Sequence, residues 1–217
     1  MAVLEGGTTG SLAEVEANVL ALRTVSLPRD VGVLGAYAAS STNGATVMTA
    51  GLAANSEILQ FRWTDATRVA TIRSVRFDMG SVVAFVAGQL LISLTIARAF
   101  TVAGSGGAAL VMTGNNNKKR TTFGTSLVGE IRGATTAALG AGTKTLDANP
   151  LGSFSFAAPT TVGPIITNQY LWTRDTSDEC PLILAANEGL VVRATVPGTG
   201  TWYFGVDIEW TEHAVFP

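Results

Sequence analysis

The clearest pattern of hydrophobic and polar positions lies near the C-terminus, where two alternating runs follow one another. Residues 190–196 form the first run, and residues 197–200, Pro-Gly-Thr-Gly, separate it from the second. In the second run every other side chain is bulky and apolar: Trp202, Phe204, Val206, Ile208 and Trp210. A period of two is typical of a strand with one buried face. The region therefore predicts an antiparallel hairpin with its aromatic residues inside.

The same pattern predicts shorter strands through the rest of the chain. They cover residues 31–37, 58–63, 69–79, 88–100, 126–132, 143–147, 151–157 and 165–173. A change of face between Ile72 and Val75 indicates a bulge in the third of these. Residues 38–45 have loop composition, and 101–125 are typical of a long surface excursion. Many short strands with at most one helix predict an all-β fold, a two-sheet antiparallel jelly-roll sandwich.

The N-terminal residues predict a separate element, an arm of residues 1–30 that precedes a jelly-roll domain of residues 31–217. Ser11 and Glu14 have the spacing of a capping box. A helix beginning there would place four apolar residues on one face: Leu12, Val15, Val19 and Leu22. The same residues also tolerate an extended conformation, so a short helix and an extended arm are both open. Such an arm either reaches a neighbouring subunit or is a simple lead-in to the domain.

The composition changes this picture by making the surface unusually neutral. Of the 217 residues only 14% are charged, against about a quarter in typical proteins, while 47% are hydrophobic. The exterior must therefore consist largely of Thr, Ser, Asn, Ala and Gly, a surface that is common where protein packs on protein. Obligate assembly and a neutral soluble monomer both fit. A net charge of −2 gives no electrostatic footprint for nucleic acid or anionic lipid, so neither is an expected partner.

Residues 79–97 lack charge over about the length that a bilayer-spanning helix needs. Glycine, serine, glutamine and threonine interrupt this segment, and its second half alternates with β-branched residues. Those features favour a central strand over a membrane span. No basic region followed by an apolar stretch marks a secretion signal at the N-terminus.

Two glycine-rich stretches come near nucleotide-binding motifs without matching them. Gly140 to Thr145 resembles a phosphate-binding loop, but Thr143 separates the glycine from Lys144 and no helix pattern follows. Gly104 to Gly107 resembles half of a dinucleotide fingerprint without its βαβ context. A hairpin turn and a flexible loop are the expected structures, and no cofactor or small-molecule substrate is expected.

Acidic residues form two candidate sites. Asp175, Asp178 and Glu179 could gather oxygens around Ca²⁺, although three carboxylates in one loop more often face water. Asp207 and Glu209 share one face of the last strand, about 7 Å apart, as the paired carboxylates of a glycoside hydrolase could be. Their alternative is an outward face paired with Arg193 and other neighbours. We expect no metal site and no catalytic pair.

The remaining chemical candidates are few. Asn115 to Arg120 is the one basic cluster, and without interleaved aromatic residues it predicts a solvated loop tip rather than a nucleic-acid site. The chain has one cysteine, Cys180, which excludes an intrachain disulfide, and one histidine, His213. These two residues form no catalytic set with the serines or aspartates. The sequence therefore predicts that the protein is not an enzyme.

Several segments resemble small structural proteins from the virions of tailed bacteriophages. The resemblance covers residues 188–210, 52–63, 96–100, 110–115 and 143–147, which are framework positions rather than a catalytic signature. It implies a jelly-roll virion component, of the capsid decoration (cement) type. Proteins of this kind usually form homotrimers on the shell and clamp adjacent major capsid subunits.

These considerations leave three hypotheses. The first is a decoration protein on the capsid surface of a virion, made in the host cytoplasm, with itself and the major capsid protein as partners. The second is a tail, collar or baseplate component with the same fold. The third is a carbohydrate-binding or glycan-cleaving jelly roll for host adsorption, which would use Asp207, Glu209 and an exposed aromatic such as Tyr203.

Overall fold

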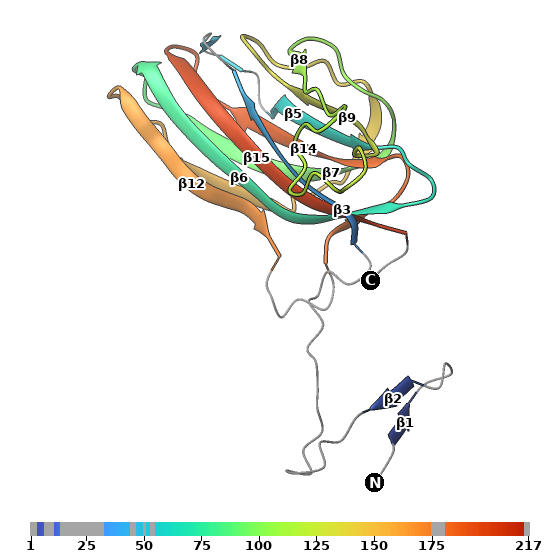
Figure 1. Ribbon diagram of the computed structural model, residues 1–217. Helices are drawn as coiled ribbons and strands as arrows, with labels where there is room; N and C mark the ends of the chain where they lie inside the picture. The colour runs from blue at the N-terminus through green and yellow to red at the C-terminus, as the bar shows by residue number, and fades with distance from the viewer. Residues whose placement is uncertain are drawn as a thin grey trace, which may run out of the picture. The chain divides into compact units, whose positions relative to one another are not determined.

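The computed structural model describes residues 4–6, 11–13, 33–43, 47–49, 51–52, 55–174 and 181–214 (Figure 1). The chain divides into two compact units, Met1–Val31 with Pro217, and Gly32–Phe216. In the first unit, strand β1 (Leu4–Gly6) pairs antiparallel with β2 (Ser11–Ala13). A helix beginning at Ser11 is therefore wrong for residues 11–13, and the rest of that predicted helix lies outside the described residues.

The second unit consists of strands and connecting loops, without a helix among its described residues. Its strands are β3 (Val33–Thr42), β4 (Met48–Thr49), β5 (Ser56–Trp63), β6 (Val69–Val83), β7 (Gln89–Val102), β8 (Ala108–Ala109), β9 (Val128–Gly133), β10 (Thr143–Leu146), β11 (Gly152–Ala157), β12 (Gly163–Thr173), β13 (Ile183–Leu184), β14 (Glu188–Thr195) and β15 (Thr201–His213). All pairings between them are antiparallel.

Two sheets face each other in this unit, and their strand order is that of a jelly roll. The first sheet runs β12-β6-β15-β3, and the second runs β7-β14-β5-β9-β8 with β10 and β11 both paired to β7. The outermost long strands in the sequence, β3 and β15, pair with each other, and so do the next two, β5 and β14. The same nesting continues inward, with β6 paired to β12 and β7 paired to β11. This is a long hairpin rolled up on itself, and it confirms the predicted all-β jelly-roll sandwich.

The predicted hairpin of the last two strands is wrong, although both strands exist. Strand β14 lies between β5 and β7 in the second sheet, whereas β15 lies between β3 and β6 in the first. Residues 196–200 therefore cross from one sheet to the other. Alternation along a strand determines which face is buried, and it carries no information about which strand pairs with it.

Other strand predictions are confirmed or extended by the structure. The bulge in β6 is confirmed, because Glu209 pairs with Ser74 and Trp210 with Ile72, so the register with β15 shifts by one residue at Arg73. Residues 38–42, predicted as a loop, continue β3 instead. Their exposed positions carry small polar residues, which gives a strand the composition of a loop. In the described part of the chain, no helix is long and apolar enough to span a membrane, and residues 79–97 contribute to β6 and β7.

Aromatic side chains join the two sheets. Trp210 of β15 stacks on Tyr37 of β3 with ring centroids 5.5 Å apart and meets Phe61 of β5 edge-on at 5.2 Å. At the other end of β15, Phe204 lies 5.6 Å from Trp202 and 6.4 Å from Phe77 of β6. All of these rings are buried, so the predicted inward face of β15 is confirmed.

Truncation of Phe61 tests this account of the core. We expect Phe61→Ala to lower the free energy of unfolding by about 3–5 kcal/mol, because it removes a fully buried ring that contacts the opposite sheet. Urea unfolding followed by tryptophan fluorescence measures the change. Val111→Ala is the control, since Val111 is 65% exposed and should change stability by about 0.5 kcal/mol or less. Equal losses in the two variants would contradict the packing described.

Candidate functional site

The paired carboxylates of β15 lie on the outer face of the first sheet, and each is matched by a cation. Asp207 Oδ2 is 3.0 Å from Arg76 Nη2 on the neighbouring strand β6. Glu209 Oε2 is 2.6 Å from Lys119 Nζ, which belongs to the connection between β8 and β9. The prediction that Arg193 pairs with these carboxylates is wrong, because Arg193 lies on β14 in the second sheet and donates to Thr95 Oγ1. The error follows from the mistaken hairpin.

The basic cluster does not form a free loop tip, because its backbone is hydrogen-bonded to the outer edge of β3. The amide of Ala38 donates to the Asn117 carbonyl at 3.0 Å, and the amide of Lys119 donates to the Ala36 carbonyl at 2.9 Å. The side-chain amide of Asn117 adds a bond to the Ala38 carbonyl. We call residues 115–120 the docked segment. Its side chains remain largely exposed, but its position on the sheet is fixed.

Between the docked segment and β15 lies a shallow groove of about 320 Å³, lined by Ala38, Ser40, Arg76, Asn117, Asp207 and Glu209 among others. Both carboxylates there are engaged by cations, and no aromatic side chain lines the groove. A glycosidase needs one carboxyl group free to donate a proton and usually an aromatic platform for the sugar. The groove therefore offers polar contacts rather than acid–base chemistry.

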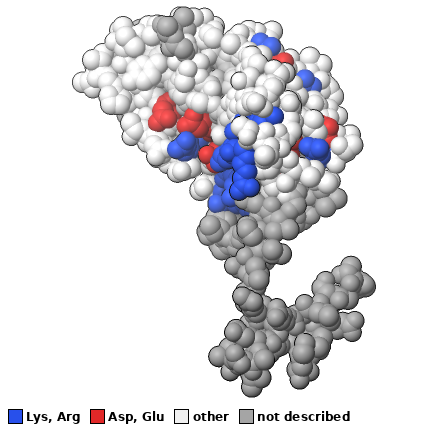
Figure 2. Space-filling model, in the orientation of Figure 1, with Lys and Arg blue, Asp and Glu red and all other residues white. Residues whose placement is uncertain are grey.

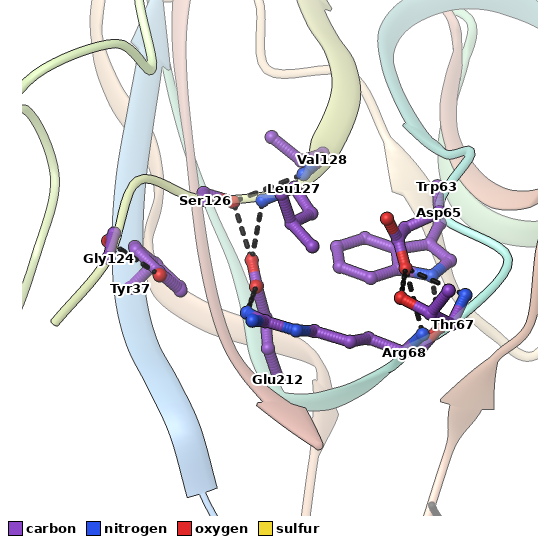
Figure 3. Close-up of polar contacts among 10 residues, drawn as sticks. All are labelled: Tyr37, Trp63, Asp65, Thr67, Arg68, Gly124, Ser126, Leu127, Val128 and Glu212. Atoms are coloured by element: carbon purple, nitrogen blue, oxygen red, sulfur yellow. Dashed lines mark hydrogen bonds and ion pairs between the residues drawn. The ribbon is translucent and has the colours of Figure 1, made fainter. Parts of the chain in front are cut away.

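A second polar cluster, centred on the buried Glu212, was missed by the sequence reasoning (Figure 3). One carboxylate oxygen accepts hydrogen bonds from the Ser126 hydroxyl at 2.7 Å and from the Leu127 amide at 3.0 Å. The other oxygen is 3.6 Å from Arg68 Nη1. Nearby, the Tyr37 hydroxyl donates to the Gly124 carbonyl at 2.9 Å. Residues 124–127 are thus held to the first sheet by two side chains from neighbouring strands.

Burial controls the protonation of this cluster. Burial raises the pKa of Glu212 above its ordinary value of 4.5, against the lowering effects of Ser126, Leu127 and Arg68. Burial also raises the pKa of Tyr37 to about 12, with a further increase from the Glu212 charge. The one sequence signal for this cluster was a carboxylate directly after the alternating aromatic run, at the end of a buried strand.

A third feature is an end of the sandwich without charged residues. Four connections meet there, because the strand pairings bring the end of β3, the end of β6 and the start of β12 beside the start of β15. The connections are the described residues between β3 and β5 (43, 47–49, 51–52 and 55, which include β4) and residues 84–88, 158–162 and 196–200. None of these residues is acidic or basic. They contact one another through hydrogen bonds such as Gly51 to Pro197 and Val86 to Thr199. We call this region the neutral end.

Exposed valines are concentrated at the neutral end. Val82, Val83, Val86 and Val162 each expose about half or more of their side chains, and Tyr203 is 42% exposed beside them. On the face shown in Figure 2, the described atoms in the corresponding upper-left part are white, and the coloured charges lie away from them. Water solvates such a surface poorly, and exposed apolar patches of this kind usually mark contacts with other proteins.

The other sequence candidates have simpler outcomes. Asp175, Asp178, Glu179 and Cys180 lie outside the described residues, and the described residues contain no acidic, histidine or cysteine group suited to a metal ion. His213 is buried and its ring nitrogen lies 2.9 Å from the Thr211 hydroxyl. The glycine-rich stretches at 104–107 and 140–142 form connections between strands rather than nucleotide-binding loops.

Comparisons with known proteins add little to this description. No family model matches the chain, and no curated protein matches it. Among solved structures, it is similar to a mutant of the unassembled VP1 pentamer of Washington University polyomavirus, with 10% identity over 88% of this chain and 96% of that one. The TM-score of 0.30 is too low to support the fold assignment, which rests on the strand order.

The raised pKa of Glu212 gives a pH dependence of stability. The folded protein holds this proton at pH values where the unfolded chain has lost it. The stabilisation that protonation provides is therefore complete below pH 4.5 and is lost as the pH rises through the folded-state pKa. We expect Glu212→Gln to remove this decrease in the free energy of unfolding with rising pH. Urea titrations between pH 4 and about pH 8 measure the difference. A variant with the wild-type pH dependence would contradict the assignment.

Proposed function

We propose that this chain is a structural protein of a virion, a capsid decoration or cement protein of a tailed bacteriophage that binds and stabilises the assembled shell. The observation that carries the proposal is the neutral end on a jelly-roll domain. A jelly roll with a broad uncharged end is suited to assembly, and its paired surface carboxylates are engaged by cations rather than free for catalysis. The protein acts by contact alone and needs no cofactor.

Copies of the same chain are the partners that the neutral end fits best. Near a rotation axis every residue faces symmetry copies of itself, so a charged residue there would meet a like charge. Four uncharged connections at one end avoid that repulsion and bring several valines together. We infer a homotrimer in which the neutral ends pack around the axis.

The rest of the surface then serves the shell. A cement protein binds the assembled lattice more tightly than free subunits, which shifts the equilibrium toward the intact shell. Three copies in one trimer turn modest individual contacts with the major capsid protein into one strong interaction. We assign the arm, residues 1–30, to reaching a neighbouring subunit.

A tail, collar or baseplate component would use the same self-assembly. Copy number separates the two roles, because a shell protein is present in hundreds of copies and a tail component in roughly a dozen or fewer. Counting copies by electron microscopy of the native particle makes this distinction. The glycan-binding alternative is weakened by the ion-paired state of Asp207 and Glu209.

A charge placed at the neutral end should disrupt self-assembly. We expect Val162→Asp to shift the protein from trimer toward monomer, because three carboxylates would meet near the axis. Sedimentation velocity at several protein concentrations measures the shift. Val111→Asp is the matched control, since this valine is equally exposed but lies outside the neutral end. A monomeric wild-type protein, or equal behaviour of the two variants, would overturn the proposed interface.

Deletion of residues 1–30 tests the role of the arm. We expect the truncated protein to keep its trimeric state and to bind purified shells more weakly, because contacts with the neighbouring subunit are lost. Co-sedimentation with shells that lack the protein measures binding. Unchanged binding would remove the arm from the proposal while leaving the neutral end in place.

A further inference from the structure

Three polar side chains meet beneath the two glycine-rich stretches, in a place that the proposed function does not use. Glu57 and Gln60 belong to β5, and Lys144 belongs to β10. Their side chains are almost completely buried, with that of Lys144 only 2% exposed. The Lys144 ammonium also lies 4.8 Å from the centre of the Phe100 ring, at the edge of a small apolar cluster separate from the main core.

One oxygen of Glu57 lies between the two nitrogen groups. Glu57 Oε2 is 2.8 Å from Lys144 Nζ and 2.5 Å from the amide nitrogen of Gln60. The amide oxygen of Gln60 accepts a hydrogen bond from the Gly104 amide at 2.8 Å, and its nitrogen donates to the Gly140 carbonyl at 2.8 Å. The carboxamide is thus held at both of its polar atoms, with a carboxylate bridging its nitrogen and a primary amine.

Glycine is required for this approach. A Cβ atom on Gly104 would lie 1.8 Å from the Gly140 carbonyl oxygen and 2.6 Å from the Gln60 amide nitrogen. Gly142 has a φ of +69°, and a Cβ there would lie 2.2 Å from the Val102 carbonyl oxygen. The glycine-rich stretches therefore allow two connections to close over Gln60 and to bring Lys144 into the same buried space.

We propose that Lys144 and Gln60 join through an isopeptide bond, with Glu57 as the catalytic proton carrier. Glu57 takes a proton from the ammonium, and the neutral amine attacks the Gln60 amide carbon. The hydrogen bond from Gly104 stabilises the oxygen that becomes negative in the intermediate. The bond from that carbon to the amide nitrogen breaks, and the nitrogen leaves as ammonia after receiving the proton from Glu57. A second lysine proton passes to the ammonia, which leaves as ammonium, and the third stays on the isopeptide nitrogen. Glu57 therefore ends as a carboxylate, and no oxidant or cofactor is needed.

The bond would link β5 to β10, two strands that belong to the second sheet but are not neighbours in it. A link between residues 60 and 144 closes a long loop of the chain, and such closure restricts the unfolded state as a disulfide does. Unlike a disulfide, it does not respond to the redox state of its surroundings. With one cysteine, the chain cannot gain the same restriction from an intrachain disulfide. This inference does not depend on the proposed function.

Mass spectrometry of the wild-type protein tests the bond directly. We expect an intact mass about 17 Da below that of the sequence, the mass of one ammonia. Trypsin does not cleave after an acylated lysine, so residues 133–174 should remain whole and be joined to residues 30–62. Loss of ammonia at Asn43–Gly44 would give the same mass change, but it would leave these two peptides separate. Unlinked peptides in the wild-type protein would overturn the proposal.

Three variants assign the roles. Lys144→Arg keeps the positive charge but lacks a primary amine, so its peptides should be unlinked. Glu57→Gln keeps both partners and removes the proton carrier, and it should also be unlinked. Lys118→Arg, a control at a partly exposed lysine in the docked segment, should keep the link. A link that persists in Glu57→Gln would overturn the role of Glu57, and a loss of about 18 Da with a link from Lys144 to Glu57 would overturn Gln60 as the acceptor. If a variant fails to fold, the wild-type digest still decides the proposal.

Discussion

The packing of β15 against the second sheet is the contact on which the rest of the domain depends. Trp210 reaches Phe61 across the sandwich while it stacks on Tyr37 in its own sheet, so one side chain joins both layers. Strand β15 also lies between β3 and β6, and its far end reaches β4. The bulge in β6 keeps apolar side chains buried on both sides of it, Ile72 before the bulge and Val75 and Phe77 after it. The outer face of β15 carries the ion pairs of Asp207 and Glu209. Near the end of the same strand, the buried carboxylate of Glu212 holds residues 124–127.

The sequence was sufficient for the number and character of most long strands, because period two is strong where one face is buried. It was not sufficient for their pairing, and the mistaken hairpin of β14 and β15 also produced the wrong partner for Asp207. The docked segment was missed for a related reason. Its attachment to β3 uses a backbone hydrogen bond accepted by Asn117 and one donated by Lys119, which residue type does not encode.

The candidate surface shows the same division between composition and topology. The low fraction of charged residues was visible in the sequence, and it fitted both obligate assembly and a neutral soluble monomer. The position of the neutral end depends on a rolled-up strand order that brings four distant connections together. The glycine-rich stretches are similar, since each was unremarkable alone and their common function of closing over Gln60 appears only when they are adjacent.

The docked segment has a further consequence for how copies of this chain can associate. An uncovered outer strand offers free amides and carbonyls to which another molecule can add, and repeated addition gives fibres without a defined length. Along part of β3 those groups are already occupied by residues of the same chain. Sheet extension along that part of the edge is therefore closed, which favours finite particles over open-ended polymers.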